Sequence, residues 1–268
     1  MSWPPLRVGS YNLWVAHWPT TATYDRAALV RAALDHVDVL GTQEGTRAHL
    51  DSLTAGTGFA ALGRSRDGGT TGEHSAILYR TARLGVVDSG DFWFSPTPDE
   101  PSVGWDAPGY RRLCTWGRFL DLDTGATFFV FNAHLDHEGT RARLESARLL
   151  LARIRTIAGT GRVVVTGDLN AEPGSEPLRA LLGGGLVDAR AVSVTPPSGP
   201  ETTFTPLVDP DRPLPGARRR IDYVLVGPDV VVDDYAVLDA RPGGRFPSDH
   251  DPVVATLRLG GDAAGGSP

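Results

Sequence analysis

Apolar and polar residues alternate over residues 6–13, and this period of two predicts a half-buried β-strand. The spacing changes over residues 24–36, where alanine, leucine and valine recur at helical intervals and Thr23 is available as an N-cap. A short apolar run over residues 37–40 then predicts a second strand. The pattern therefore predicts that the chain opens with a strand-helix-strand unit.

The rest of the pattern predicts one long helix and eight more strands. The helix covers residues 141–158, where an apolar face lies opposite a face of arginine and glutamate. The turn-forming residues 123–125 predict a hairpin between the two strands that flank them. The predicted strands cover residues 75–79, 84–94, 113–121, 126–135, 162–166, 219–226, 230–238 and 252–258.

Two segments rich in glycine and proline interrupt this pattern. Residues 95–110 are predicted to form a long loop that tryptophan keeps packed, and residues 183–217 a loop with little regular structure. The composition from Gly260 onward predicts a frayed tail. We expect one α/β domain over residues 1–259, with two sheets packed together and covered by helices, followed by a disordered tail over residues 260–268.

Composition favours a soluble globular protein. Of the 268 residues, 41% are hydrophobic and 22% are charged. One cysteine excludes an internal disulfide, and neither a secretory signal nor an apolar run of bilayer length is visible, so we expect a cytoplasmic location and no membrane association. The net charge of −6 disfavours a dedicated binder of duplex DNA. All 26 basic residues are arginine, which we attribute to codon usage.

Chemically reactive side chains follow the predicted strands in five places. These places are residues 43–44, 132–134, 167–170, 220–223 and 247–252, and each lies where a strand gives way to a loop. Carboxylates, histidines and asparagines delivered to one rim of a sheet are the groups that metal-assisted phosphoryl transfer requires. One such motif would be weak evidence, but five in order predict a catalytic site.

The residue types suggest individual roles. A hard cation such as Mg²⁺ prefers carboxylate ligands, so Glu44 is the best candidate ligand, although an acid that caps a turn would have the same sequence. His134 and His250 follow apolar strands and are predicted to donate hydrogen bonds to a pentacoordinate phosphate. Asp222 is the predicted partner of His250, and a turn-capping aspartate beside Arg220 is the alternative.

Asp168 and Asn170 are separated by one residue after an apolar strand. In extended backbone they would share a face and point into one pocket. The aspartate could then orient or deprotonate water, and the amide could hold a phosphate oxygen. The alternative interpretation is an Asx turn after the strand.

In order and identity, these motifs resemble the endonuclease/exonuclease/phosphatase superfamily of metal-dependent phosphoesterases. The resemblance extends from Tyr11-Asn12 to Asp249-His250. It implies a four-layer α/β sandwich in which two mixed sheets are flanked by helices. It also implies a role for each matching residue: Asn12 near the phosphate and metal, Glu44 as principal metal ligand, His134 as transition-state donor, Asp168 for water activation, Asn170 on the phosphate, Asp222 paired with His250, and Asp249 near the metal.

Other residues indicate which branch of the superfamily the chain resembles. Apurinic endonucleases carry an acid where this chain has Trp14, which disfavours an abasic-site enzyme. Residues 91–98, 104–106 and 112–116 resemble a bacterial subgroup in which Glu73 and Arg112 face the site. Arg112 could clamp a phosphate with two nitrogens, and Trp105 is predicted to contact the substrate. A packing or surface role is the alternative for Glu73 and Arg112.

The sequence thus predicts a hydrolase that depends on Mg²⁺ or Mn²⁺ and cleaves a small or nucleotide-like phosphoester by in-line attack of water. No protein partner is predicted. The alternative is a nuclease on single-stranded RNA or DNA with Trp14, Trp93 and Trp105 as stacking platforms, although aromatics of this kind more often belong to the core. A non-catalytic binding module is disfavoured because each expected position holds a competent residue. Fold cannot select the substrate, so we expect selectivity in the loops 95–112 and 183–217.

Overall fold

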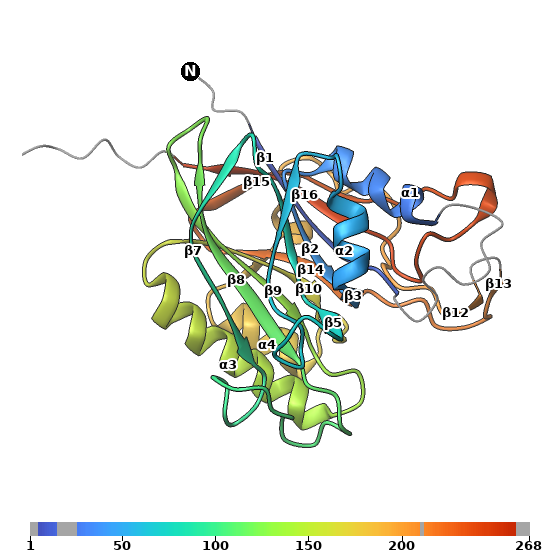
Figure 1. Cartoon of the computed structure of the whole chain (residues 1–268), viewed down its shortest axis with the longest axis horizontal. Helices are drawn as coiled ribbons and strands as arrows, with labels where there is room; N and C mark the ends of the chain where they lie inside the picture. The colour runs from blue at the N-terminus through green and yellow to red at the C-terminus, as the bar shows by residue number, and fades with distance from the viewer. Residues whose placement is uncertain (1–4, 15–25, 210–211, 261–268) are drawn as a thin grey trace, which may run out of the picture.

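The computed structural model describes residues 5–14, 26–209 and 212–260, and its strands form two six-stranded sheets (Figure 1). The first sheet contains, in spatial order, β15 (Val230–Val237), β16 (Val253–Leu259), β1 (Leu6–Asn12), β2 (Val39–Gln43), β6 (Ile77–Arg80) and β4 (Phe59–Leu62). The second contains β11 (Val187–Asp188), β14 (Asp222–Val226), β10 (Arg162–Asp168), β9 (Thr127–His134), β8 (Leu113–Asp121) and β7 (Leu84–Trp93). Two short ribbons pair β3 (Gly45–Thr46) with β5 (Glu73–His74) and β12 (Leu207–Asp209) with β13 (Arg212–Pro213).

Each large sheet contains one parallel pair of strands near its centre. β1 runs parallel to β2, and β9 runs parallel to β10, while the other pairings are antiparallel. The carboxyl ends of each parallel pair lie side by side, with Asn12 beside Gln43 and His134 beside Asp168. Such ends are the usual location of ligand sites in sheets with parallel strands. The topology therefore places the predicted motifs of both sheets at strand ends.

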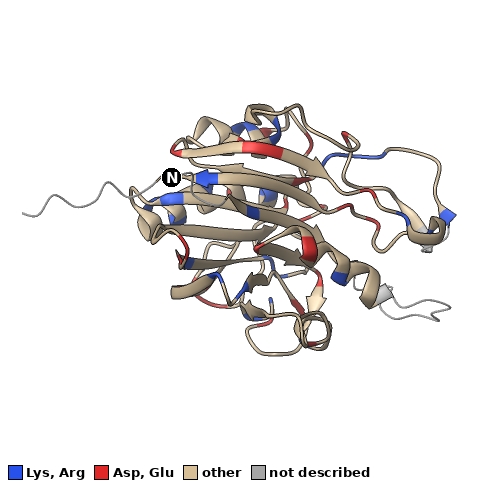
Figure 2. Cartoon of the chain, turned by 90° about the horizontal axis from the view of Figure 1, so that it is seen from above, with Lys and Arg blue, Asp and Glu red and all other residues tan. Residues whose placement is uncertain are grey.

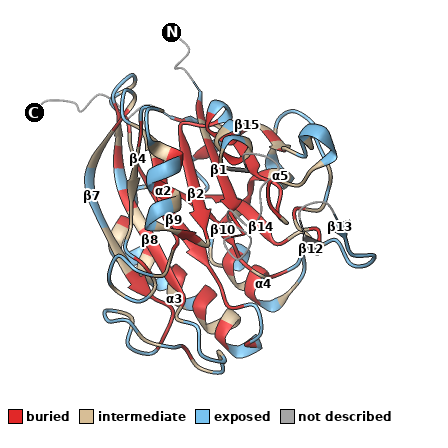
Figure 3. Ribbon diagram, turned by 45° about the vertical axis from the view of Figure 1, so that its right-hand side comes forward, coloured by how far each residue is buried: buried red, intermediate tan, exposed pale blue. Residues whose placement is uncertain are grey.

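Helices cover the outer face of each sheet and complete four layers (Figure 3). Leucines and alanines of the amino-terminal helices pack on the first sheet, and the apolar faces of the two longer carboxyl-side helices pack on the second. The helical segments are α1 (Arg26–Arg31), η2 (Ala32–His36), α2 (Arg47–Thr54), α3 (Thr140–Ala158), α4 (Glu176–Gly183), α5 (Ala189–Val192) and η3 (Pro242–Gly244). None of the described helices is long and apolar enough to cross a membrane. The expected four-layer α/β sandwich is confirmed.

A buried polar network joins the two sheets near the strand ends. The Asn132 amide group donates to the carbonyl oxygens of Thr42 and Ala76, and its Oδ1 accepts from Gln43 at 2.8 Å and from Thr166 at 3.0 Å. Elsewhere, valine, leucine and phenylalanine side chains fill the space between the sheets. The network fixes the relative position of the sheets more specifically than apolar contacts do, because each buried polar atom requires its partner.

The predicted elements are largely present with shifted bounds. The predicted helix over 24–36 is α1 followed by the 3₁₀ segment η2, and Thr23 lies outside the described residues. The strand predicted over 219–226 starts only at Asp222, because the backbone of Arg219 pairs with Phe204 instead. Nearly all of the predicted tail also lies outside the described residues.

Other predictions about local structure were incomplete. α2, β4 and α4 were not predicted, and the segment 183–217 contains β11, α5, β12 and β13 rather than loop alone. The segment 95–110 is packed as expected, because the Asp106 carboxylate accepts hydrogen bonds from the Arg141 and Ala142 amides at 3.1 and 2.6 Å. Asp106 thereby caps α3, whose own N-cap residue, Gly139, has no side chain for that purpose.

Substitution of Gly41 tests the close contact between the sheets. A Cβ atom at Gly41 would lie 2.2 Å from Thr166 Oγ1 and 2.4 Å from Asn132 Oδ1. Gly41→Ala is therefore expected to lower the free energy of unfolding by about 3 kcal/mol, the upper range for overpacking. Gly85→Ala in β7 is the control, since its Cβ would meet only Leu122 at 3.8 Å. Equal urea-denaturation midpoints for the two variants would contradict this account.

Candidate active site

The predicted residues converge on a cavity of about 310 Å³ at the strand ends. It is lined by eight of the eleven residues singled out from the sequence: Glu44, Glu73, Arg112, His134, Asp168, Asn170, Asp249 and His250. Asn12 and Asp222 lie directly behind this lining and hydrogen-bond to it. The structure thus brings together residues that lie more than two hundred positions apart in the chain.

Asn12 connects two of the cavity's carboxylates. Its Nδ2 donates to Glu44 Oε1 at 3.1 Å and to Asp168 Oδ2 at 3.0 Å, and its Oδ1 accepts from the Trp14 amide at 2.9 Å. Asn12 thereby holds the two acids in place through its amide nitrogen. The role of Asn12 as a metal ligand, near the phosphate, stays a prediction.

Glu44 and Asn170 have positive φ angles, a backbone conformation that residues other than glycine rarely adopt. Their φ angles are +63° and +45°. Asn170 lies in a turn, where its amide donates to Asp168 Oδ1 at 2.9 Å and its Nδ2 donates to the Leu135 carbonyl at 3.0 Å. Asp168 and Asn170 therefore reach the cavity through an Asx-type turn, and not through extended backbone as predicted. Left-handed residues of this kind cluster at functional sites.

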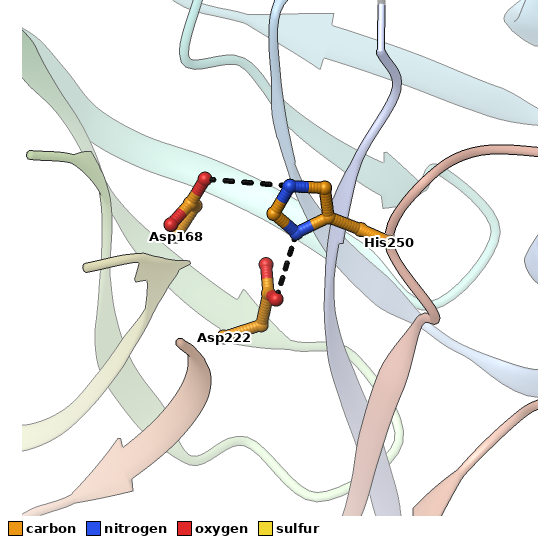
Figure 4. A group of neighbouring side chains, drawn as sticks. All are labelled: Asp168, Asp222 and His250. Carbon is orange, nitrogen blue, oxygen red and sulfur yellow. Dashed lines mark hydrogen bonds and ion pairs between the residues drawn. The ribbon is translucent and has the colours of Figure 1, made fainter. Parts of the chain in front are cut away.

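His250 lies between two aspartates (Figure 4). Its Nδ1 is 2.8 Å from Asp222 Oδ2, and its Nε2 is 3.8 Å from Asp168 Oδ2. Burial alone would lower the pKa of His250, but Asp222, with help from Asp249 and Asp168, raises that pKa well above its usual value. The Asp222 carboxylate therefore favours the protonated form of His250, whose Nε2 faces Asp168.

His134 has the opposite electrostatic environment. Burial lowers its pKa well below the usual value, and the adjacent Arg112 guanidinium lowers it in addition. One Arg112 nitrogen is 2.9 Å from His134 Nε2, and the other is 2.8 Å from His137 Nδ1. His134 Nε2 is also 3.6 Å from Asp168 Oδ2. Asp168 thus has a neutral histidine on one side and a charged one on the other.

The acids of the cavity have the chemistry of a hard-cation site. Burial, followed by the nearby carboxylates of Glu44 and Asp168, raises the pKa of Asp249 to about 7, while His250 acts in the opposite direction. Burial and Asp222 likewise raise the pKa of Asp168. A divalent cation among these oxygens would supply the positive charge that the cluster lacks, and carboxylate oxygens are ligands that Mg²⁺ and Mn²⁺ accept. The residues therefore fit such an ion.

The three tryptophans considered as stacking platforms lie outside the cavity lining. Trp93 is completely buried, and its indole nitrogen donates to the Arg66 carbonyl at 2.7 Å. Trp14 is also buried, at 8% exposure. Trp105 is half-buried against the core beside α3 and does not line the cavity. None of the three is placed to stack on a substrate in this cavity.

Several cavity residues were missed by the sequence analysis. Arg66, Tyr110, Phe204 and Arg219 line the cavity beside the predicted set. Thr203 lies behind it, where its hydroxyl donates to Asp222 Oδ2 at 2.6 Å and accepts the amides of Ile221 and Asp222, both at 3.1 Å. No sequence pattern marked these positions, because each depends on pairing between distant segments. The position of Thr203, one residue before an aromatic in a Pro-rich segment, was the only local signal.

A family model for the endonuclease/exonuclease/phosphatase family matches residues 9–250. The chain belongs to the endonuclease/exonuclease/phosphatase family. The matched segment starts in β1 and ends at His250, so it contains every strand end that contributes to the cavity. Membership places the chain among phosphoesterase hydrolases, in agreement with the resemblance identified from the motifs.

Solved structures of this family align over nearly the whole chain. An endonuclease/exonuclease/phosphatase family protein from Bacteroides thetaiotaomicron has a TM-score of 0.85 and 35% identity, covering 96% of this chain and 98% of that one. A mannosyl-6-phosphatase from Bacteroides thetaiotaomicron VPI-5482 has a TM-score of 0.84 and 35% identity, covering 94% of this chain and 99% of that one.

Uncharacterized protein L388 of Acanthamoeba polyphaga mimivirus is 32% identical over 87 residues, which is 30% of this chain and 31% of the viral protein.

Substitution of Thr203 tests whether its hydroxyl holds Asp222 and His250 in place. Thr203→Val keeps the shape but removes the donor to Asp222, and it leaves two buried amides without their acceptor. We expect the free energy of unfolding to fall by about 2 kcal/mol and the His250 ring N–H proton resonance to move. Thr203→Ser is the matched variant and should retain both values. Wild-type resonance and stability in Thr203→Val would disprove this role.

Proposed function

We propose that this chain is a divalent-metal-dependent phosphoesterase that hydrolyses a small phosphate monoester, with a sugar phosphate as the substrate class. The observation that carries the proposal is the cavity in which Asp168 lies between His134 and His250, beside Glu44 and Asp249. The 35% identity to a mannosyl-6-phosphatase over 94% of this chain supports a phosphorylated sugar. A cavity of about 310 Å³ is of the size that small-molecule sites have.

Glu44 and Asp249 are the residues that would hold the cation, with Asp168 beside them. When bound, Mg²⁺ or Mn²⁺ supplies charge neutralisation on the phosphoryl oxygens and on the leaving oxygen. Asn12 keeps Glu44 and Asp168 at fixed positions through its two hydrogen bonds. The carboxylates are therefore pre-organised, which lowers the cost of reorganisation during the reaction.

The remaining side chains orient water and stabilise charge. Asp168 accepts a proton from the attacking water, and its orientation is set by the Asn12 amide and by the backbone amide of Asn170. The His250 imidazolium, held by Asp222, donates a hydrogen bond to a phosphoryl oxygen. His134, neutral beside Arg112, accepts a hydrogen bond from the guanidinium at Nε2, so its Nδ1–H is the donor for a second phosphoryl oxygen. The second hydrogen of the Asn170 amide group remains for a third oxygen, since the first binds Leu135.

The nuclease alternative receives less support from the structure. Its proposed stacking platforms Trp14 and Trp93 are buried in the core, and Trp105 lies outside the cavity lining. Acidic and basic segments are interspersed along the ribbon, and the net charge is −6 (Figure 2). Binding of a nucleic acid normally relies on a continuous basic surface that releases counterions. A small phosphoester therefore remains the preferred substrate.

Removal of the metal tests the proposed cofactor. Treatment with EDTA should reduce hydrolysis of a sugar phosphate to background, because the acids would then repel the phosphate, and Mg²⁺ or Mn²⁺ should restore it. Glu44→Gln should raise the Mg²⁺ concentration needed for half-maximal activity at least tenfold. The measurement is phosphate release against metal concentration. Turnover that survives EDTA and dialysis would contradict the proposed metal dependence.

Substitution of Asp168 tests its assignment as the group that activates water. Asp168→Asn keeps the shape and one of the two hydrogen bonds that Asn12 and the Asn170 amide donate to Asp168, but it removes the proton acceptor, so kcat should fall by about 10²- to 10⁴-fold. Asp233→Asn, a half-buried aspartate that pairs with Arg258 on the neighbouring strand, is the control and should retain full activity. Circular dichroism should show both variants folded. A kcat within threefold of wild type in Asp168→Asn would exclude this role.

A further inference from the structure

A hairpin between α2 and β6 forms one wall of the cavity. Residues 65–74, here named the 65–74 hairpin, double back so that Ser65 bridges His74 and the Arg66 amide donates to the Glu73 carbonyl at 2.7 Å. Arg66 and Glu73 therefore lie opposite each other, and both side chains line the cavity. Their side chains form an ion pair, with Arg66 Nη1 2.7 Å from Glu73 Oε2.

Contacts other than the Arg66–Glu73 ion pair hold the 65–74 hairpin in place. The Trp93 indole donates to the Arg66 carbonyl at 2.7 Å, and Asp67 pairs with Arg111 at 2.9 Å. The Arg66 and Glu73 side chains are half-buried, at 17% and 23% exposure, and both still line the cavity. Neither side chain of the pair hydrogen-bonds to Asp168, His250 or Asn12, so the proposed chemistry leaves the pair unused.

We infer that the Arg66–Glu73 pair binds hydroxyl groups on the leaving group of the substrate. This inference rests on the proposed function and identifies the residues that select its substrate. A carboxylate oxygen accepts from a hydroxyl, and the adjacent guanidinium donates to the neighbouring one, so together they match a pair of adjacent sugar hydroxyls. The Tyr110 ring, 4.9 Å from the Arg66 guanidinium and half-exposed, adds a flat apolar surface beside them.

The charge of Glu73 defines the class of leaving group further. A carboxylate in the cavity wall repels a second phosphate, so it disfavours nucleoside diphosphates and triphosphates. A neutral group with several hydroxyls, of hexose size, satisfies both members of the pair. A leaving group that lacks hydroxyls is expected to bind weakly, because it would remove water from the charged pair without replacing the hydrogen bonds.

The test compares two monoesters that present the same phosphate group. Hydrolysis of a hexose 6-phosphate and of phenyl phosphate is measured with Mg²⁺ in the wild type, in Glu73→Gln and in Arg66→Met. Each variant should lower kcat/KM for the hexose phosphate about 10- to 100-fold more than for phenyl phosphate, chiefly through KM, the range expected for a lost hydrogen bond to a charged group. Asp67→Asn, which breaks the other ion pair of the hairpin, is the control and should leave the ratio unchanged.

The outcomes separate this inference from the proposed function. If the metal-loaded wild type hydrolyses neither ester, the proposed function is overturned and the inference with it. Hydrolysis of both esters, with the same kcat/KM ratio in the wild type and in both variants, would overturn the inference alone. A wild type that prefers a nucleoside diphosphate to a hexose phosphate would overturn it as well, since Glu73 would then not exclude a second phosphate.

Discussion

The side chain of Asn132 joins the two sheets directly behind the cavity. It bonds to β2 through Gln43, to β10 through Thr166, and to the carbonyl oxygens of Thr42 and Ala76. Gln43 is followed by Glu44, and Thr166 lies two residues before Asp168 on the same strand. A buried amide that must satisfy several partners at once permits few alternative arrangements of the sheets. The positions of the reactive carboxylates are thus set by the same contacts that align the sheets.

This arrangement concentrates acids where folding alone would disperse them. Glu44, Asp168 and Asp249 converge on one cavity, and burial raises the pKa of Asp168 and Asp249. Glu44 also occupies a left-handed conformation that costs free energy in a residue other than glycine. Neither feature stabilises the fold. Conflicts between local preference and global structure of this kind are expected where function, rather than stability, selects the residue.

The sequence located the cavity residues at strand ends, here named the floor, better than the residues that line its sides, here named the walls. Glu44, His134 and Asp168 follow or end apolar strands, so strand pattern and residue type locate them without any knowledge of distant contacts. Thr203 and Arg66 carry no such signal, because their positions depend on hydrogen bonds to segments elsewhere in the chain. Trp93 carries an ambiguous signal for a related reason, since pattern alone cannot distinguish an aromatic that packs into the core, as Trp93 does, from one that faces a ligand.

This division between floor and walls also has a chemical basis. The floor comes from strand ends fixed by hydrogen bonding within and between the sheets, so it can present the same phosphate chemistry to many substrates. The walls come from the 65–74 hairpin and from Tyr110, which line the cavity but do not align the floor, whereas the segment around Phe204 pairs with residues 249–251 and belongs with the floor. Changes in the walls can alter the leaving group that is accepted without moving Asp168 or His250. A fold of this construction can therefore retain one reaction while its members differ in substrate.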